Sequence, residues 1–209
     1  MQYCWFDCET SGTNPKIHKI LTVYFSIYNE QLEFVDELEL FLKPDDGNVI
    51  AEEKALAVNN INLEQHLNSP NTLTYTQGNK LILEFFKKHK PKGRGKLRPS
   101  GHNIQFDENF ILGNGLVTEE DWETTIHHNH LDTLKIVTFM QDIGMVPNDI
   151  GRLVDFAEHF GVLNADAHDA KRDVKMNVEV YKRLKSMLTQ TKNNSVMAAG
   201  SDLLKIIEL

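Results

Sequence analysis

Residues 3–12 read Tyr-Cys-Trp-Phe-Asp-Cys-Glu-Thr-Ser-Gly, an aromatic-rich run that favours a β-strand. The segment 11–15, Ser-Gly-Thr-Asn-Pro, consists of residues that favour a turn, so the strand is expected to end there. Alternate side chains of a strand leave the same face, so Asp7 and Glu9 share one face, about 6.6 Å apart along the backbone. Phe6 and Cys8 face the other way. The first strand therefore presents two carboxylates on one surface.

The elements that follow predict an α/β fold with a mixed sheet. The β-rich segments 17–28 and 34–42 continue the first strand as an antiparallel, three-stranded start. Helical spacing then dominates residues 50–90, most clearly 79–89. After a short segment into Gly101, the remaining elements that we expect are a helix at 107–112, a strand at 131–134, a helix capped by Asn148 or Asp149 that ends at Gly161, and a long helix at 167–188.

The composition indicates one ordinary globular domain. The chain has 209 residues, of which 41% are hydrophobic and 25% charged, which excludes disordered and fibrous classes. We assign residues 1–188 to this domain and 189–209 to a flexible linker with a short apolar tail. The longest apolar stretch, 20–28, is far short of the roughly 20 residues that cross a bilayer. We therefore expect a cytoplasmic, soluble protein with no membrane partner, in which Cys4 and Cys8 stay reduced because about 13 Å separates them on a strand.

The net charge of −8 argues against a simple electrostatic nucleic-acid binder, but the charge is unevenly spread. Between Glu84 and Asp107 the chain has seven basic and no acidic residues. Within this basic loop, residues 87–98, Lys92, Arg94 and Lys96 could follow the phosphates of a nucleic-acid strand. The alternative is a solvated lysine-rich loop.

Two carboxylates on one strand face repel each other unless a cation lies between them, and oxygen-only ligands select ions such as Mg²⁺ or Mn²⁺. By themselves Asp7 and Glu9 could equally be a solvated strand end. Their interpretation changes because two further segments accompany them, residues 101–110 and residues 167–173.

Residues 6–12 resemble the first motif of an exonuclease family, His102-Asn103-x-x-Phe106-Asp107 the second, and His168-x-Ala170-x-x-Asp173 the third. Together they resemble the DEDDh 3′→5′ exonucleases, the group of the proofreading epsilon subunit of bacterial DNA polymerase III, over residues 3–185. The resemblance implies a ribonuclease H-like fold with a five-stranded mixed sheet. It also implies that Asp7, Glu9, Asp107 and Asp173 hold two divalent cations, Mg²⁺ or Mn²⁺, and that His168 is the general base.

The resemblance further implies where a nucleotide binds. In the family, the backbone after the first motif approaches the terminal nucleotide, which makes Thr10, Ser11 and Gly12 candidates for seating it. The second motif adds His102, Asn103 and Phe106 as candidate substrate-binding residues. The segment 58–61, Val-Asn-Asn-Ile, resembles a Val-His-Gly-Ile stretch that borders the terminal base, but Asn59 replaces the histidine, which puts its contacts in doubt.

The function that these motifs imply is 3′→5′ hydrolysis of single-stranded nucleic acid, preferably DNA, from a free 3′ end by a two-metal mechanism that releases nucleoside 5′-monophosphates. The alternatives are an RNA-trimming enzyme of the same family and an inactive module that only binds nucleic acid. A zinc hydrolase built on His127, His128 and His130 is a third, although their spacing is not that of a zinc site. Residues 202–209 are a candidate contact with a polymerase or with a second copy of the chain.

Overall fold

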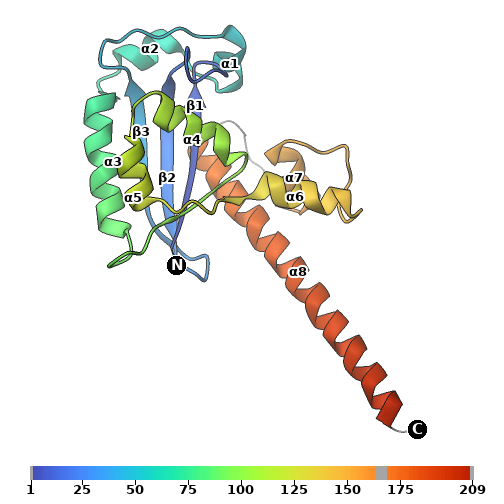
Figure 1. Ribbon diagram of the computed structural model, residues 1–209. Helices are drawn as coiled ribbons and strands as arrows, with labels where there is room; N and C mark the ends of the chain where they lie inside the picture. Colours follow the sequence, from blue (N-terminus) through green and yellow to red (C-terminus); the bar gives the residue numbers. More distant parts are fainter. Residues whose placement is uncertain (1, 163–168, 208–209) are drawn as a thin grey trace.

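The computed structural model describes residues 2–162 and 169–207 and shows an α/β fold built on one mixed sheet (Figure 1). The sheet has six strands in the order β4-β3-β2-β1-β5-β6. Three longer strands, β1 (Tyr3–Thr10), β2 (Ile20–Tyr28) and β3 (Phe34–Lys43), form the expected antiparallel meander. The short strands β4 (Thr72–Thr74), β5 (Arg98–Gly101) and β6 (Leu131–Asp132) each pair in parallel with a neighbour.

The expected strand count of five is therefore corrected to six. The additional strand is β4, whose three residues pair with β3 at Phe41–Lys43. Three residues are too few for the alternation of apolar and polar side chains to indicate a strand in the sequence. Its pairing with β3 was thus decided by the tertiary structure.

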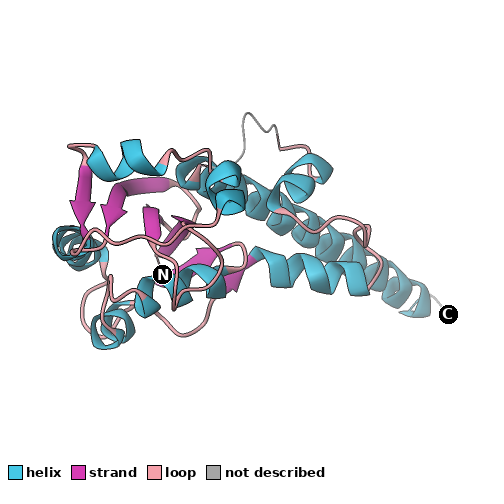
Figure 2. Cartoon of the chain, turned by 90° about the horizontal axis from the view of Figure 1, so that it is seen from above, coloured by secondary structure: helices cyan, strands magenta, loops and turns pink. Residues whose placement is uncertain are grey.

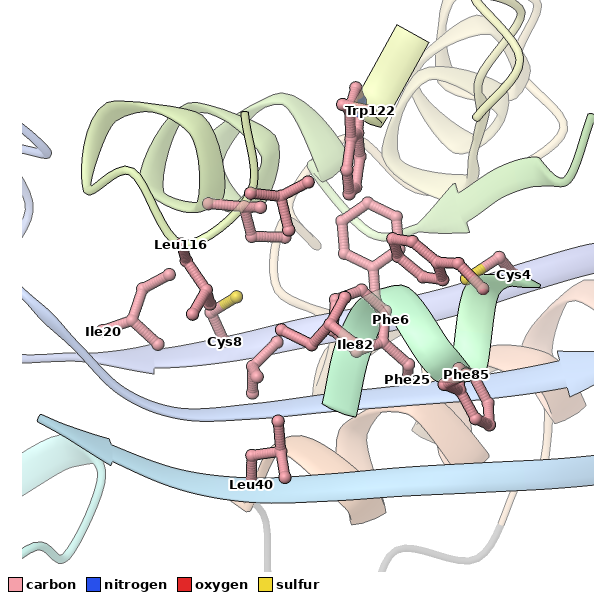
Figure 3. Close-up of a cluster of buried hydrophobic side chains, with 14 of the residues drawn as sticks. Cys4, Phe6, Cys8, Ile20, Phe25, Leu40, Ile82, Phe85, Leu116 and Trp122 are labelled. Carbon is pink, nitrogen blue, oxygen red and sulfur yellow. The ribbon is translucent and has the colours of Figure 1, made fainter. Parts of the chain in front are cut away.

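Helices cover both faces of the sheet (Figure 2). One face carries the main core, in which Phe6 and Phe25 of the sheet pack against side chains of α3, α4 and α5 (Figure 3). On the other face, Trp5 and Tyr24 pack against Val174 of α8. The helices are α1 (Glu53–Val58), α2 (Leu63–Asn68), α3 (Tyr75–His89), α4 (Ile104–Gly113), α5 (Glu119–Thr125), α6 (Thr133–Asp142), α7 (Leu153–His159) and α8 (Ala170–Ile207).

Three predicted boundaries were wrong. The helix expected at 107–112 begins at Ile104, so Asp107 lies in the first turn of α4. The strand expected at 131–134 ends at Asp132, because the Asp132 carboxylate accepts the N–H of Leu134 and starts α6 there. The helix expected to begin near 148 begins at Leu153, after Arg152.

Helix α8 is longer than the expected helix, which ended at residue 188, since α8 continues to Ile207 (Figure 1). Propagation of an existing helix adds one hydrogen bond for each residue that it fixes, so a packed first half can extend into a segment that would not fold alone. The division of the chain into a domain at 1–188 and a tail at 189–209 stays a prediction. Within the described ranges, none of the helices is both long enough and apolar enough to span a membrane.

Strand β1 is buried on the face opposite its carboxylates. Cys4, Phe6 and Cys8 all point into the main core, as the alternation predicted. Both cysteines are free thiols, so the expectation of reduced, buried cysteines is confirmed. The same alternation leaves Asp7 and Glu9 on the face that α8 partly covers.

Candidate functional site

Three carboxylates from the two ends of the chain converge beside β1. Asp7 and Glu9 project from β1, and Asp173 projects from the first turn of α8. One oxygen of each lies within 4.8 Å of an oxygen of the others, a spacing at which they could hold a metal ion. The structure thus brings together three of the four acidic residues that the sequence motifs singled out.

The fourth, Asp107, lies on α4 and is only 3% exposed. Its Oδ1 accepts the backbone N–H of Cys8 at 2.9 Å, which joins α4 to β1 between the two strand carboxylates. Asp107 is not one of the three residues within 4.8 Å of one another, but its charge acts on Asp7. A strand N–H points sideways in the plane of the sheet, so Asp107 lies at the edge of β1, beside the two acids that the strand carries.

Burial and mutual repulsion oppose ionisation of this cluster. The pKa of Asp7 lies well above its ordinary value, first because burial removes water and then because Asp107, Glu9 and Asp173 are negative. The same two causes raise the pKa of Glu9 to about 7, and burial raises that of Asp107. A divalent cation would relieve this repulsion, and an oxygen-only donor set suits Mg²⁺ or Mn²⁺. The residues present therefore fit a hard divalent metal.

The raised pKa values of these carboxyl groups predict how a bound divalent cation would change the stability of the fold. The pKa of Glu9 rises from 4.5 to about 7 on folding, so between these values the folded protein binds more protons than the unfolded one. The free energy of unfolding of the metal-free protein consequently loses the contribution of Glu9 as the pH rises through this window. We expect 10 mM Mg²⁺ to raise the melting temperature by a few degrees at pH 8 and by much less at pH 5.

Differential scanning fluorimetry with Mg²⁺ or EDTA at both pH values measures this difference. The variant Glu9→Gln should reduce the pH dependence, because the side chain can no longer titrate. An equal shift at pH 5 and pH 8 would contradict the prediction, as would a shift of the same size in Glu9→Gln.

A cleft of about 420 Å³ opens beside the carboxylates. Of the predicted substrate-binding residues, Thr10, Gly12, Asn59 and Phe106 line it. Asn59 Nδ2 donates to the carbonyl of Thr10 at 3.0 Å, which ties the end of α1 to the end of β1. Val58, from the segment 58–61 that the resemblance indicated, also lines it, and so do four residues that the sequence motifs did not indicate: Thr13, Glu52, Lys54 and Ala55. No local pattern distinguishes them, since they become neighbours of β1 only through the tertiary fold.

Ser11 and Gly12 have structural reasons for their identities. The Ser11 hydroxyl is buried, donates to the carbonyl of Ile50 at 2.6 Å and accepts the N–H of Lys19 at 2.9 Å, so it braces the loop and does not line the cleft. A Cβ at Gly12 would lie 2.4 Å from the His18 ring, so any side chain there would force the buried ring to move. Gly12 is therefore required by packing against His18, although it also lines the cleft.

His102 and Asn103 lie away from the cleft. The His102 ring packs on Phe156 with centroids 5.4 Å apart, and its burial lowers its pKa to about 4, so it stays neutral. Asn103 has a left-handed backbone, and its N–H donates to Asp132 Oδ1 at 3.0 Å. Both residues shape the entry into α4, the helix that carries Phe106 and Asp107.

The basic loop lies at the other end of the sheet. Arg98, at its end, pairs with Tyr3, whereas Glu9 lies six residues further along β1, which is about 20 Å away. Lys92, Arg94 and Lys96 belong to this loop, which follows α3 (Figure 1). The Lys96 ammonium donates to the carbonyl of Glu123. The geometry separates them from the carboxylates, and their contact with nucleic-acid phosphates stays a prediction.

His168, the predicted general base, lies outside the described residues. The structure resumes at Asp169, whose Oδ1 accepts the N–H groups of Lys171 at 2.9 Å and Arg172 at 3.4 Å. The Lys171 ammonium binds Glu37 on β3, whose carboxylate also accepts the Tyr24 hydroxyl at 2.6 Å. These contacts fix the first turn of α8 on the sheet and thereby position Asp173.

The histidines at 127–130 form no metal group in the part of the chain that the structure covers. The rings of His127 and His128 stack with centroids 4.4 Å apart, and His130 pairs with Glu108 at 3.1 Å. Among the described residues, the acidic triad beside β1 is the group whose spacing could hold a metal ion.

No protein-family model and no curated protein sequence matches this chain. Among solved structures, it is similar to E. coli exonuclease I in complex with a dT13 oligonucleotide, with a TM-score of 0.70, 17% identity, and coverage of 92% of this chain and 43% of that chain. The zinc-ion-bound form of the E. coli exonuclease I complex with single-stranded DNA has a TM-score of 0.70 and 17% identity, and the match covers 92% of this chain and 42% of that chain. Exonuclease I from Methylocaldum szegediense has a TM-score of 0.67 and 20% identity, and the match covers 88% of this chain and 40% of that chain.

This chain therefore spans about two fifths of the length of these exonucleases. At such low identity the likeness concerns the fold. It confirms the expected α/β architecture, because the mixed sheet flanked by helices matches the ribonuclease H-like fold of the exonuclease, with six strands where five were expected.

Proposed function

We propose that this protein is a metal-dependent 3′→5′ exonuclease that shortens single-stranded DNA and releases nucleoside 5′-monophosphates. The observation that carries the proposal is the convergence of Asp7, Glu9 and Asp173 within 4.8 Å, beside a cleft lined by residues of the first motif. The fold shared with exonuclease I supports it. The three ordered motifs place the chain, in this proposal, in the DEDDh group.

In the proposed mechanism, Asp7, Glu9, Asp107 and Asp173 hold two divalent cations, Mg²⁺ or Mn²⁺. When bound, such a pair activates the attacking water and stabilises the leaving oxygen of an in-line displacement at phosphorus. Water oxygen forms a bond to phosphorus while the bond from phosphorus to the 3′ oxygen of the remaining strand breaks. His168 accepts the proton of the water, and the leaving 3′ oxygen takes up a proton.

In the proposal, the walls of the first cleft bind the terminal nucleotide. Thr10 and Gly12 offer backbone and small side chains at the end of β1, and Phe106 offers an apolar surface from α4. The Asn59 amide is already held by the Thr10 carbonyl, so the wall formed by the end of α1 is fixed before a substrate arrives. Pre-organised walls of this kind orient the scissile phosphate towards the carboxylates.

DNA is the proposed substrate because the solved exonuclease I structures of the same fold include complexes with single-stranded DNA. An exoribonuclease of the same family is the second candidate, since the motifs concern phosphate and sugar more than base sequence. An inactive binding module is disfavoured by the presence of all four acidic residues. A proofreading role, and contact of residues 202–209 with a polymerase or a second copy, remain parts of the proposal that follow from the motifs alone.

The test uses matched DNA and RNA oligonucleotides that carry a label at the 3′ or the 5′ end. With Mg²⁺ or Mn²⁺ we expect a 3′ label to be released at once as a mononucleotide, and a 5′ label to remain on a ladder of shortening products. EDTA should stop both the release of the 3′ label and the shortening of the 5′-labelled strand. First release of the 5′ label would refute the polarity, and undiminished cleavage in EDTA would refute the metal. Faster cleavage of the RNA strand would favour the second candidate.

A further inference from the structure

A second cleft, of about 370 Å³, adjoins the one that lies beside the carboxylates. Glu9 and Asn59 line both clefts, so the two hollows meet at the proposed reaction centre. The segment 58–61 borders both: Val58 lines the first cleft, and Asn60 and Ile61 line the second. A phosphodiester held at the carboxylates would therefore have a hollow on each side of it.

The floor of the second cleft is a row of side chains across the sheet. Glu9 of β1 pairs with Thr22 of β2, and Thr22 pairs with Phe41 of β3. Phe41 lies between Leu40 and Leu42, which point into the core, so its own ring points to the opposite face. It is 42% exposed there. An aromatic ring thus borders the cleft two strands away from a proposed metal ligand.

The ring of Phe41 is suited to a flat ligand. Among the described residues, its aromatic neighbour is His66, which meets it edge-on at 66°, with ring centroids 6.4 Å apart. Stacking of a nucleobase on an aromatic side chain tolerates any base sequence, because every base has a π-face. The remaining walls include Asn60, Glu39 and Asp169, which offer hydrogen-bonding groups to base edges, and the cationic Arg172, which could approach a phosphate.

We propose that this second cleft binds the nucleoside on the 5′ side of the scissile phosphate, with its base stacked on Phe41. The inference rests on the proposed function, because it takes the reacting phosphate to lie at Asp7, Glu9 and Asp173. With the terminal nucleotide in the first cleft, the next base along the strand falls on the other side of Glu9, where Phe41 lies. A base paired in a duplex cannot stack there, so the cleft selects single-stranded ends.

The experiment compares Phe41→Ala with the wild type on two oligonucleotides, one natural and one abasic at the penultimate position. For the natural strand we expect Phe41→Ala to raise KM about tenfold or more, in line with the loss of one base–aromatic stack. For the abasic strand, the KM of Phe41→Ala should exceed that of the wild type by less than about twofold. Phe41→Trp should retain tight binding of the natural strand.

The matched control is Phe34→Ala. Phe34 is another exposed phenylalanine of the same strand, at 52% exposure, but seven residues away from Phe41 and outside both clefts. Its replacement should change KM less than twofold for either strand. A KM ratio for Phe41→Ala that is the same on natural and abasic strands would overturn the proposal, as would an unchanged KM for the natural strand.

The failure of this inference can be distinguished from failure of the proposed function. Hydrolysis of a mononucleotide nitrophenyl ester by the wild type requires the carboxylates and the first cleft but offers no second base. One outcome is metal-dependent hydrolysis of this ester, with the same KM ratio of Phe41→Ala to wild type on the natural and abasic strands. This outcome would support the exonuclease activity and reject the second base site. Absence of any metal-dependent hydrolysis on both the ester and oligonucleotides would reject the proposed function itself.

Discussion

Asp7→Asn is expected to lower the rate of 3′-end hydrolysis by at least about 10³-fold at saturating Mg²⁺, which corresponds to a loss of about 4 kcal/mol of transition-state stabilisation. The asparagine keeps the size of the side chain and loses its charge. Asp7 lies in the centre of the acidic group, since Asp107, Glu9 and Asp173 all raise its pKa by repulsion. Removing its charge therefore weakens the hold on the cation without leaving a void.

The same substitution is expected to leave the metal-free protein as stable as before or more stable. A buried carboxylate that is repelled by its neighbours opposes folding when it is ionised, so its neutral replacement removes that cost. Thermal unfolding in EDTA at pH 8 measures this effect, and an oligonucleotide assay measures the rate. A matched control is Asp142→Asn at an exposed position on α6, which should change neither quantity. A variant of Asp7 that unfolds earlier and retains activity would contradict the proposed role.

His168→Ala should lower kcat by about 10²- to 10⁴-fold, the range for loss of a general base. The prediction comes from the third sequence motif, which places His168 next to the residue that caps α8 and five residues before Asp173. Because a histidine is not among the four proposed metal ligands, binding of Mn²⁺ should change less than twofold. Calorimetric titration with Mn²⁺ and single-turnover rates separate these two effects.

The pH profile gives an independent test of the same residue. An imidazole with an ordinary pKa near about 6.5 accepts a proton only when it is neutral, so the wild-type rate should fall as the pH drops through that value. His168→Ala should lose this limb of the profile. A kcat within threefold of the wild type, or a profile with the acidic limb unchanged, would show that another group takes the proton.

Much of the sheet could be predicted because its long strands carry their own signals. Alternation along residues 3–9 correctly placed Asp7 and Glu9 on one face and Phe6 and Cys8 in the core. Short elements carried no such signal. The three residues of β4 depend on β3, which is distant in the sequence, and the Asp132 carboxylate, which caps α6 through the nearby Leu134, also accepts the N–H of the distant Asn103.

The roles assigned within the motifs divide in the same way. The motifs identified the acidic residues, but they gave Ser11, His102 and Asn103 as contacts of the nucleotide. In the structure these three residues brace the first loop and the entry into α4 through partners that no motif contains, such as Ile50, Phe156 and Asp132. The basic loop was likewise plausible by charge alone, yet parallel pairing of β5 with β1 places it about 20 Å from Glu9.

The sequence by itself predicted which chemical groups the proposed site contains, and it determined on which face of β1 two of them lie, because side-chain alternation is a local property of a strand. Only the tertiary structure decided that Asp173 reaches them within 4.8 Å, that Asp107 accepts the N–H of Cys8 at the edge of β1, and that two clefts meet at Glu9. The reason is physical. Cavities and charge repulsion arise from surfaces of segments far apart in the chain, and folding alone brings those surfaces into contact.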